Sequence, residues 1–269
     1  MDEFNRLCIT KTASTINSLL GVPVREETAE PLQEVLAGAA QIFGNRQCDR
    51  VFLYNPDAVA MWIYEKYKDS FAELEKRLSL RLPMLSVVPP VTPVCFGSMY
   101  SGLLPEKHGI MKYEKPVLKV KTVFDDMAQN GKRAAIVSTE GDSISKIFLN
   151  REIDYFIYPT KQECNRKALE LVEEDSHALI VLYNGDYDYY MHRFTPEGKR
   201  PLRALRENIE TCCGIYDAIK AHWKNHNCTM AFAPDHGCHR KYLFLGSHGI
   251  NEVCDMNIMH FYGFLPASR

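Results

Sequence analysis

Residues 178–192 read ALIVLYNGDYDYYMH. An almost continuous apolar run, 178–183, is followed at once by polar residues that include Asp188 and His192. A short apolar run without polar alternation is typical of a parallel strand that is covered on both faces. The stretch therefore predicts a buried strand that leads into a polar segment with side chains suited to chemistry.

Similar runs occur along the rest of the chain, at 51–54, 84–88, 134–138, 154–158 and 229–233. Amphipathic stretches predict helices at 31–43, 59–80, 92–101, 121–130, 161–174 and 199–224. Strands that alternate with helices favour an α/β fold, with a mostly parallel central sheet sandwiched by helices. The stretch 103–120, which contains charges and proline, is predicted to be a surface loop.

Composition limits the classes of protein and partner. The chain has 269 residues, 46% of them hydrophobic, and a formal net charge of -2, which fits one large domain without a surface for bulk nucleic acid. The N-terminus lacks the pattern of a secretory signal, and no apolar run approaches the ~18 residues of a membrane span, so no membrane partner is expected. The nine cysteines show no paired zinc-binding pattern and are interpreted as reduced thiols of a cytoplasmic protein.

Polar side chains follow four of the predicted strands. Asp57, Thr92, Asp188 and Asp235 each come soon after an apolar run. The carboxyl ends of parallel strands share one edge of the sheet, where ligands bind in α/β proteins. A single such aspartate would more often be a helix cap, but four polar residues in this position indicate a site.

Three histidines accompany these residues. His192 follows Asp188 by one helical turn, His236 follows Asp235 directly, and His248 lies between two glycines. Carboxylates combined with imidazoles favour zinc, manganese or iron over magnesium or calcium. The set is large enough for two divalent cations, most suitably zinc. Asp186 and His239 remain alternatives to Asp188 and His248 as ligands.

Segment 92–110, TPVCFGSMYSGLLPEKHGI, resembles the nucleophile motif of the type I phosphodiesterase and nucleotide pyrophosphatase branch of the alkaline phosphatase superfamily. The later motifs Asp188-x-x-x-His192, Asp235-His236-Gly237 and Gly246-Ser247-His248-Gly249 resemble that family's metal-binding segments and occur in the same order. The resemblance implies that Thr92 is a metal-bound nucleophile. It also implies that Asp188, His192 and His248 hold one metal, and that Asp57, Asp235 and His236 hold the other.

The resemblance also implies an organisation and an activity. Residues 48–269 would form an alkaline phosphatase-like catalytic domain, and residues 1–47 a helical N-terminal extension packed on it. Because His248 comes only twelve positions after His236, the cap over the substrate should be small, or built from 1–47 and 103–120. The expected activity is hydrolysis of a small phosphodiester or nucleotide pyrophosphate through a phospho-threonine intermediate.

Several alternatives remain at this stage. A phosphomonoesterase, a phosphonate hydrolase, a phosphomutase or a non-catalytic metal- or phosphate-binding relative could share the same scaffold. Cys95 stands where the family often has an asparagine that contacts the phosphoryl group, and a thiol is a weaker donor. Cys95, Lys112 and Tyr187 are the candidate substrate contacts.

Overall fold

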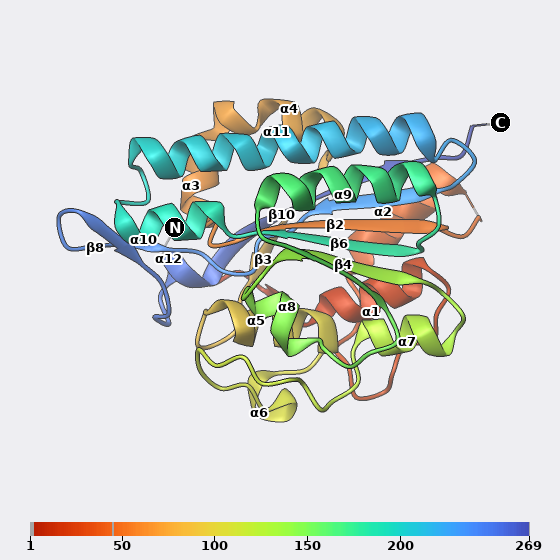
Figure 1. Ribbon diagram of the computed structural model, residues 1–269, viewed down its shortest axis with the longest axis horizontal. Helices are drawn as coiled ribbons and strands as arrows, with labels where there is room; N and C mark the ends of the chain where they lie inside the picture. Colours follow the sequence, from red (N-terminus) through yellow and green to blue (C-terminus); the bar gives the residue numbers. More distant parts are fainter. Residues whose placement is uncertain (1–2, 45, 269) are drawn as a thin grey trace.

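An eight-stranded sheet forms the centre of the computed structural model, which describes residues 3–44 and 46–268 (Figure 1). The strand order is β1-β3-β10-β7-β2-β6-β4-β5. The bounds of these strands are β1 (Leu7–Cys8), β2 (Arg50–Pro56), β3 (Leu80–Leu85), β4 (Ala134–Thr139), β5 (Asp154–Tyr158), β6 (Leu179–Asn184), β7 (Cys228–Phe232) and β10 (Asn257–Leu265). The predicted α/β class with a mostly parallel sheet is confirmed.

The strand directions decide where a site can form. β2 pairs in parallel with both β6 and β7, and β4 pairs in parallel with β5 and β6. β10 is antiparallel to β3 on one side and to β7 on the other, while β1 is parallel to β3. In the described sheet every strand except β10 therefore runs in one direction, and their carboxyl ends lie along one edge.

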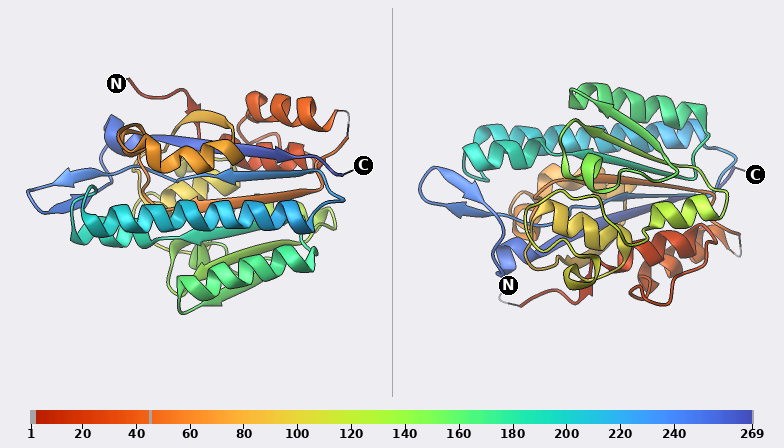
Figure 2. Two further views of the ribbon diagram at one scale, coloured as in Figure 1. Left: turned by 90° about the horizontal axis from the view of Figure 1, so that it is seen from above. Right: turned by 60° about the horizontal axis from the view of Figure 1, so that its bottom comes forward.

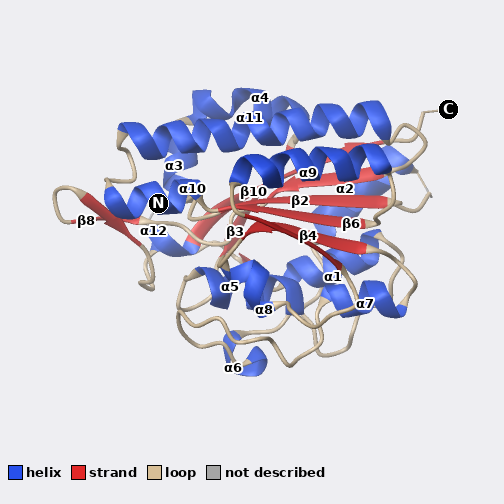
Figure 3. Cartoon of the chain, viewed as in Figure 1, coloured by secondary structure: helices blue, strands red, loops and turns tan. Residues whose placement is uncertain are grey.

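Helices cover both faces of the sheet (Figures 1 and 3). One face carries α1 (Lys11–Leu19), α2 (Gln33–Phe43), α5 (Thr92–Ser101), α7 (Val123–Gln129) and α8 (Ser143–Ile147). The other carries α3 (Met61–Lys66), α4 (Ala72–Arg77), α9 (Lys161–Glu174) and α11 (Lys199–His222). Two hydrophobic cores result, and side chains along β2 alternate between them: Val51 and Leu53 enter one, Phe52 and Tyr54 the other.

Some element boundaries differ from the sequence prediction. The run 84–88 was expected to be a strand, but β3 ends at Leu85 and the chain then turns toward Thr92. Pro89 and Pro90 cannot donate backbone hydrogen bonds to a sheet, which favours this exit. The predicted helix 59–80 is divided into α3, a 3-10 helix η1 (Lys68–Phe71) and α4 before β3 begins.

The N-terminal segment and the segment 103–120 complete the description of the fold. Within 1–47, β1 pairs with β3 at the sheet edge, and α1 packs against α5 and α7. The segment 103–120 contains the short helix α6 (Pro105–His108) and is otherwise loop. No helix in the described part of the chain is long and apolar enough to cross a membrane.

Candidate metal centre

The carboxyl edge of the sheet brings all seven predicted residues together. Asp57 follows β2, Thr92 opens α5, and α10 (Asp186–Arg193), which follows β6, carries Asp188 and His192. The remaining three lie on the segment after β7, on either side of the hairpin of β8 (His239–Lys241) and β9 (Leu245–Ser247), and are Asp235, His236 and His248. The parallel strands account for this convergence, because each one delivers the residues after it to the same edge.

One half of the site is built from Asp57, Asp235 and His236, whose potential ligand atoms lie within 4.8 Å of one another. His236 Nε2 lies 3.3 Å from Asp57 Oδ1 and 3.4 Å from Asp235 Oδ2. Thr92 Oγ1 lies 3.4 Å from both Asp57 Oδ2 and His236 Nε2. The hydroxyl of residue 92 is thus adjacent to a buried group of metal-ligand type.

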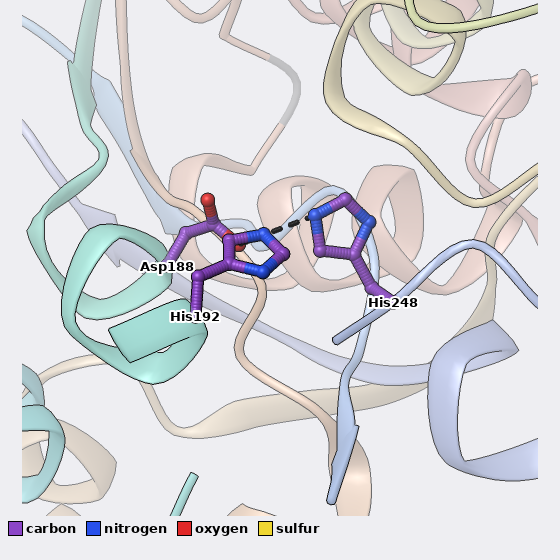
Figure 4. A group of neighbouring side chains, drawn as sticks. All are labelled: Asp188, His192 and His248. Carbon is purple, nitrogen blue, oxygen red and sulfur yellow. Dashed lines mark ion pairs between the residues drawn. The ribbon is translucent and has the colours of Figure 1, made fainter. Parts of the chain in front are cut away.

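The other half contains Asp188, His192 and His248, again with ligand atoms within 4.8 Å. Figure 4 shows the two imidazoles approaching Asp188 from different segments, His192 from α10 and His248 from the chain after β9. Each Nε2 lies 3.3 Å from Asp188 Oδ1. The rings of His236 and His248 are only 4.2 Å apart between centroids, so the two halves form one centre.

The hydrogen bonds around these groups leave lone pairs directed into the centre. Three buried carboxylate oxygens have no hydrogen-bond partner, namely Asp57 Oδ1, Asp188 Oδ1 and Asp235 Oδ2. Backbone carbonyls lie 2.9 Å from His236 Nδ1 and 3.1 Å from His248 Nδ1. Because a carbonyl can only accept, each Nδ1 donates and each Nε2 keeps its lone pair, as in a histidine that ligates a metal. These residues fit two divalent cations.

The ionisation of the carboxyl groups reflects the same crowding. Burial raises the pKa of Asp235 to about 7. Burial, and then the negative charges of Asp235 and Asp188, raise the pKa of Asp57 well above its usual range. Burial alone would also raise the pKa of Asp188, but the His192 and His248 imidazoles beside its Oδ1 outweigh burial and lower that pKa. Among the described residues, the half that contains Asp57 and Asp235 therefore has less compensating positive charge than the half that contains Asp188.

A cavity of about 280 Å³ opens beside the centre. Besides Asp57, Asp188 and His192, it is lined by side chains that the sequence analysis did not select, including Tyr113, Lys115, Asp142, Lys161, Tyr189 and Arg193. Asp142 and Lys161 come shortly after β4 and β5. Asp57 and Asp235 were selected because they are polar residues that follow the ends of strands. The same criterion could have selected Asp142 and Lys161.

Tyr183 is a further residue that the sequence analysis did not select as a site residue. Its hydroxyl donates a hydrogen bond to Asp57 Oδ2, the oxygen nearest Thr92. This contact fixes the orientation of the Asp57 carboxylate and leaves Oδ1 directed at His236. Of the two segments expected to contribute a cap, 103–120 reaches the cavity through Tyr113 and Lys115, whereas no described residue of 1–47 lines it.

The structure does not bring Cys95, Lys112 and Tyr187 into the lining of this cavity. Cys95 is fully buried with its Sγ 3.1 Å from Ser86 Oγ, and Lys112 is exposed and pairs with Glu114 at 2.8 Å. Tyr187 is fully buried and its hydroxyl donates to the Pro196 carbonyl.

The two alternative ligands also have other partners. Asp186 pairs with Lys161. His239 forms a separate group with Cys254 and Asp255, in which the two oxygens of Asp255 are already taken by His239 Nδ1 and the Ile250 N–H. Asp188 and His248 are therefore the members of each pair that lie in the centre.

Comparison with known proteins agrees with this geometry. The family model described as type I phosphodiesterase / nucleotide pyrophosphatase matches residues 56–150, a segment that contains Asp57 and Thr92. The resemblance predicted from the nucleophile motif is thus confirmed, while the motifs at 188–192, 235–237 and 246–249 lie outside the matched residues. The structural neighbours below show that the fold is alkaline phosphatase-like. No curated protein sequence matches it.

Solved structures with this fold are distant in sequence. Murine ectonucleotide pyrophosphatase / phosphodiesterase 5 has 16% identity and a TM-score of 0.56, over 71% of this chain and 58% of its own. An inactive variant of the murine protein, in complex with AMP, gives 14% identity and a TM-score of 0.57, with the same coverage of both chains. Phosphonoacetate hydrolase from Sinorhizobium meliloti, in complex with phosphonoformate, has 15% identity and a TM-score of 0.52, over 73% of this chain and 59% of its own. The chain therefore spans about three fifths of the length of these neighbours.

Proposed function

We propose that this chain is a two-metal hydrolase of phosphate esters, acting on phosphodiesters or nucleotide pyrophosphates with Thr92 as its nucleophile. The observation that carries the proposal is the set of three unpartnered, buried carboxylate oxygens beside the Thr92 hydroxyl and three imidazoles. Buried polar atoms without partners are costly, and cations would satisfy all three. The type I phosphodiesterase match over residues 56–150 supports the same reading.

The two groups of ligands assign the residues to two cations. Asp57, Asp235, His236 and Thr92 would hold one cation, and Asp188, His192 and His248 the other. Such cations would favour the ionised hydroxyl of Thr92 and neutralise charge on the phosphoryl group. Nitrogen and oxygen ligands in sets of three or four suit zinc best, with manganese as the second choice.

The chain's own residues then carry two displacement steps. Thr92 loses its proton as Oγ1 attacks phosphorus, the bond from phosphorus to the leaving oxygen breaks, that oxygen takes up a proton, and a phospho-threonine forms. Water attacks that intermediate, the bond from phosphorus to Thr92 Oγ1 breaks, and the proton released by the water returns to the hydroxyl. Thr92 opens a ten-residue helix, so the positive end of the helix dipole would lie beside the phosphoryl group.

The cavity walls support a small nucleotide as the substrate. The ring of Tyr189 is half exposed and lies 3.6 Å from the Arg193 guanidinium, and Tyr113 presents a second exposed ring. Aromatic faces of this kind stack on bases. A structural neighbour with 14% identity was solved in complex with AMP, which is in keeping with this substrate class.

The Thr92→Ala variant tests the nucleophile. We expect turnover of bis-p-nitrophenyl phosphate to fall by at least about a thousandfold, because no other hydroxyl replaces Oγ1. Thr92→Ser keeps an oxygen nucleophile and is the matched control that should retain measurable turnover. Near-normal activity in purified Thr92→Ala would exclude Thr92 as the nucleophile.

Metal analysis and a substrate panel test the rest of the proposal. Two equivalents of zinc or manganese per chain, with faster turnover of the diester than of p-nitrophenyl phosphate, are expected. Faster monoester turnover would instead favour a phosphomonoesterase, and turnover of phosphonoacetate a phosphonate hydrolase. Two bound metals without turnover of any ester would indicate a non-catalytic metal- or phosphate-binding protein.

We further propose that the protein works in a reducing compartment such as the cytoplasm. All nine cysteines are unpaired thiols, and seven of them are buried. Titration of the denatured protein, purified without reductant, should find nine free thiols. A stable disulfide recovered from cells would contradict this assignment.

A further inference from the structure

The β8–β9 hairpin projects beyond the body of the molecule at the end of the sheet that carries the site (Figures 1 and 2). Its turn exposes three large apolar residues in succession, Tyr242, Leu243 and Phe244, with 78%, 74% and 77% of their surface in water. Leu245 adds a fourth, 41% exposed. Neighbouring apolar side chains exposed to this degree mark an interaction site rather than ordinary surface.

The base of the hairpin is firmly attached to the protein. The two strands pair from His239 with Ser247 to Lys241 with Leu245. Gly246 packs so closely on α10 that an added Cβ would lie 2.3 Å from Met191 Sδ. The hairpin also connects His236 to His248, so its tip, residues 242–245, extends from a segment anchored at the metal centre.

The charge next to the tip is positive. Residues 239–250 contain no aspartate or glutamate but include Arg240 and Lys241. Arg240 forms an ion pair with Glu197 at 3.8 Å, and Lys241 extends over the Tyr242 ring. An apolar tip with aromatic residues and flanking basic side chains complements the anionic surface of a lipid bilayer.

The size of the tip also favours a bilayer over a protein partner. A stable protein interface buries about 800 Å² on each partner, which a convex tip of four residues cannot supply alone. Insertion into the headgroup region needs only a few apolar side chains together with basic neighbours. We propose that the tip, residues 242–245, docks the protein on an anionic lipid surface. No membrane partner was expected from the sequence because no span is present, but surface docking requires none.

Sedimentation with vesicles tests the proposal. The wild-type protein should bind vesicles of phosphatidylcholine with about 30% phosphatidylserine, and bind pure phosphatidylcholine vesicles much more weakly. The double variant Leu243→Asp/Phe244→Asp should lose at least about tenfold in affinity. Arg240→Gln/Lys241→Gln should weaken binding to anionic vesicles and reduce its dependence on salt. Leu169→Asp, at a partly exposed leucine on α9, is the control and should bind as wild type does.

Activity separates this proposal from the proposed function. All hairpin variants should hydrolyse bis-p-nitrophenyl phosphate in solution as wild type does, because none of the changed residues lines the cavity. Wild-type protein that does not bind anionic vesicles, or a double variant that binds equally well, would overturn the proposal. Light scattering that shows a dimer, dissociated by the same double variant, would identify the tip as a contact between copies and would also overturn it.

Discussion

At the scale of single residues, Asp57 is the most informative position in the centre. It is buried, its pKa is raised by burial and by the charges of Asp235 and Asp188, and its Oδ1 has no hydrogen-bond partner. In the metal-free protein, Asp57→Asn should therefore increase the free energy of unfolding, because the uncharged amide avoids the cost of burying that carboxylate. With metal added, the wild type should be the more stable of the two proteins, because the variant has lost a candidate metal ligand.

Urea unfolding with chelator and with excess zinc would measure both effects. The matched control is Asp126→Asn, since Asp126 is equally buried but accepts hydrogen bonds from Arg25 at 3.0 Å and Asn17 at 2.8 Å. Breaking a satisfied pair should destabilise the protein in both conditions. If the metal-free Asp57→Asn variant is less stable than wild type, then uncompensated negative charge at the site does not destabilise the metal-free protein, and the prediction is wrong.

The sequence predicted the seven residues of the centre but not its walls. Strand ends locate Asp57 or His236 along the chain, because parallel topology fixes the edge to which they go. Tyrosines 183, 187, 189 and 190 lie close together in sequence, but Tyr183 is on β6 whereas the other three are on α10. The directions of those three depend on how α10 is rotated against α11 and the hairpin. Only the packed structure shows that Tyr183 binds Asp57 while Tyr187 is buried in a core.

At the scale of elements, the contact between α5 and the short helix α6 depends on one glycine on α5. An added Cβ at Gly97 would lie 2.7 Å from His108 Cε1. The His108 ring cannot move aside easily, since Ser98 Oγ and the Ile110 N–H hold its two nitrogens at 3.0 and 3.2 Å. Gly97→Ala should therefore lower the free energy of unfolding by about 1–3 kcal/mol. Gly214→Ala on α11, where no atom lies within 4 Å, is the matched control.

The control should be neutral or more stable by up to about 1 kcal/mol, because alanine favours a helix over glycine. Thermal or urea unfolding of the two variants gives the comparison directly. Equal stabilities for the two alanine variants would mean that the His108 contact is not rigid.

β10 contains a histidine whose ionisation makes the fold sensitive to acid. Burial lowers the pKa of His260 to about 4, from an ordinary 6.5, and its Nε2 donates to the Pro234 carbonyl at 2.8 Å. The neutral ring is favoured in the fold, so its stabilisation is complete above pH 6.5 and is lost as the pH falls toward 4. Between pH 7 and 4.5 this loss is about 2–3 kcal/mol.

Unfolding free energies of His260→Gln and wild type, measured from pH 7 to 4.5, test this effect. Glutamine takes up no proton, so the variant should lose about 2 kcal/mol less over this range than wild type. Replacement of the exposed His222 by glutamine controls for a general effect of removing a histidine. Parallel pH profiles for wild type and His260→Gln would refute the prediction.

The same strand shows why one element was not predicted. β10 reads NIMHFYGFL, in which His260 and Gly263 interrupt the apolar run that identified the other strands. His260 is tolerated in the core because the Pro234 carbonyl accepts a hydrogen bond from its Nε2–H. Gly263 is required because a Cβ would lie 2.6 Å from the Arg77 carbonyl oxygen. Both reasons are tertiary contacts, which local patterns do not contain.

At the scale of the whole molecule, the centre joins elements that are otherwise held together by separate cores. Its candidate ligands come from the loop after β2, from α5, from α10 and from the segments on either side of the hairpin. Bound cations would link these elements, and a ligand present at a hundred times its dissociation constant stabilises a fold by about 2.7 kcal/mol. We therefore expect chelation to loosen the carboxyl edge of the sheet more than its remote parts.

Hydrogen exchange with and without chelator can locate this loosening. Amides of α10 and of residues 247–251 should exchange at least about tenfold faster in the metal-free protein, since Asp188 and His248 would lose their shared ion. Amides of β5 and of the middle of α9, which carry none of the ligands, serve as the internal control. Restored protection on addition of zinc would tie the change to the centre, because a globally destabilised chain would exchange faster in both regions. Equal protection of α10 in the two states would mean that the carboxylates are held by the polypeptide alone.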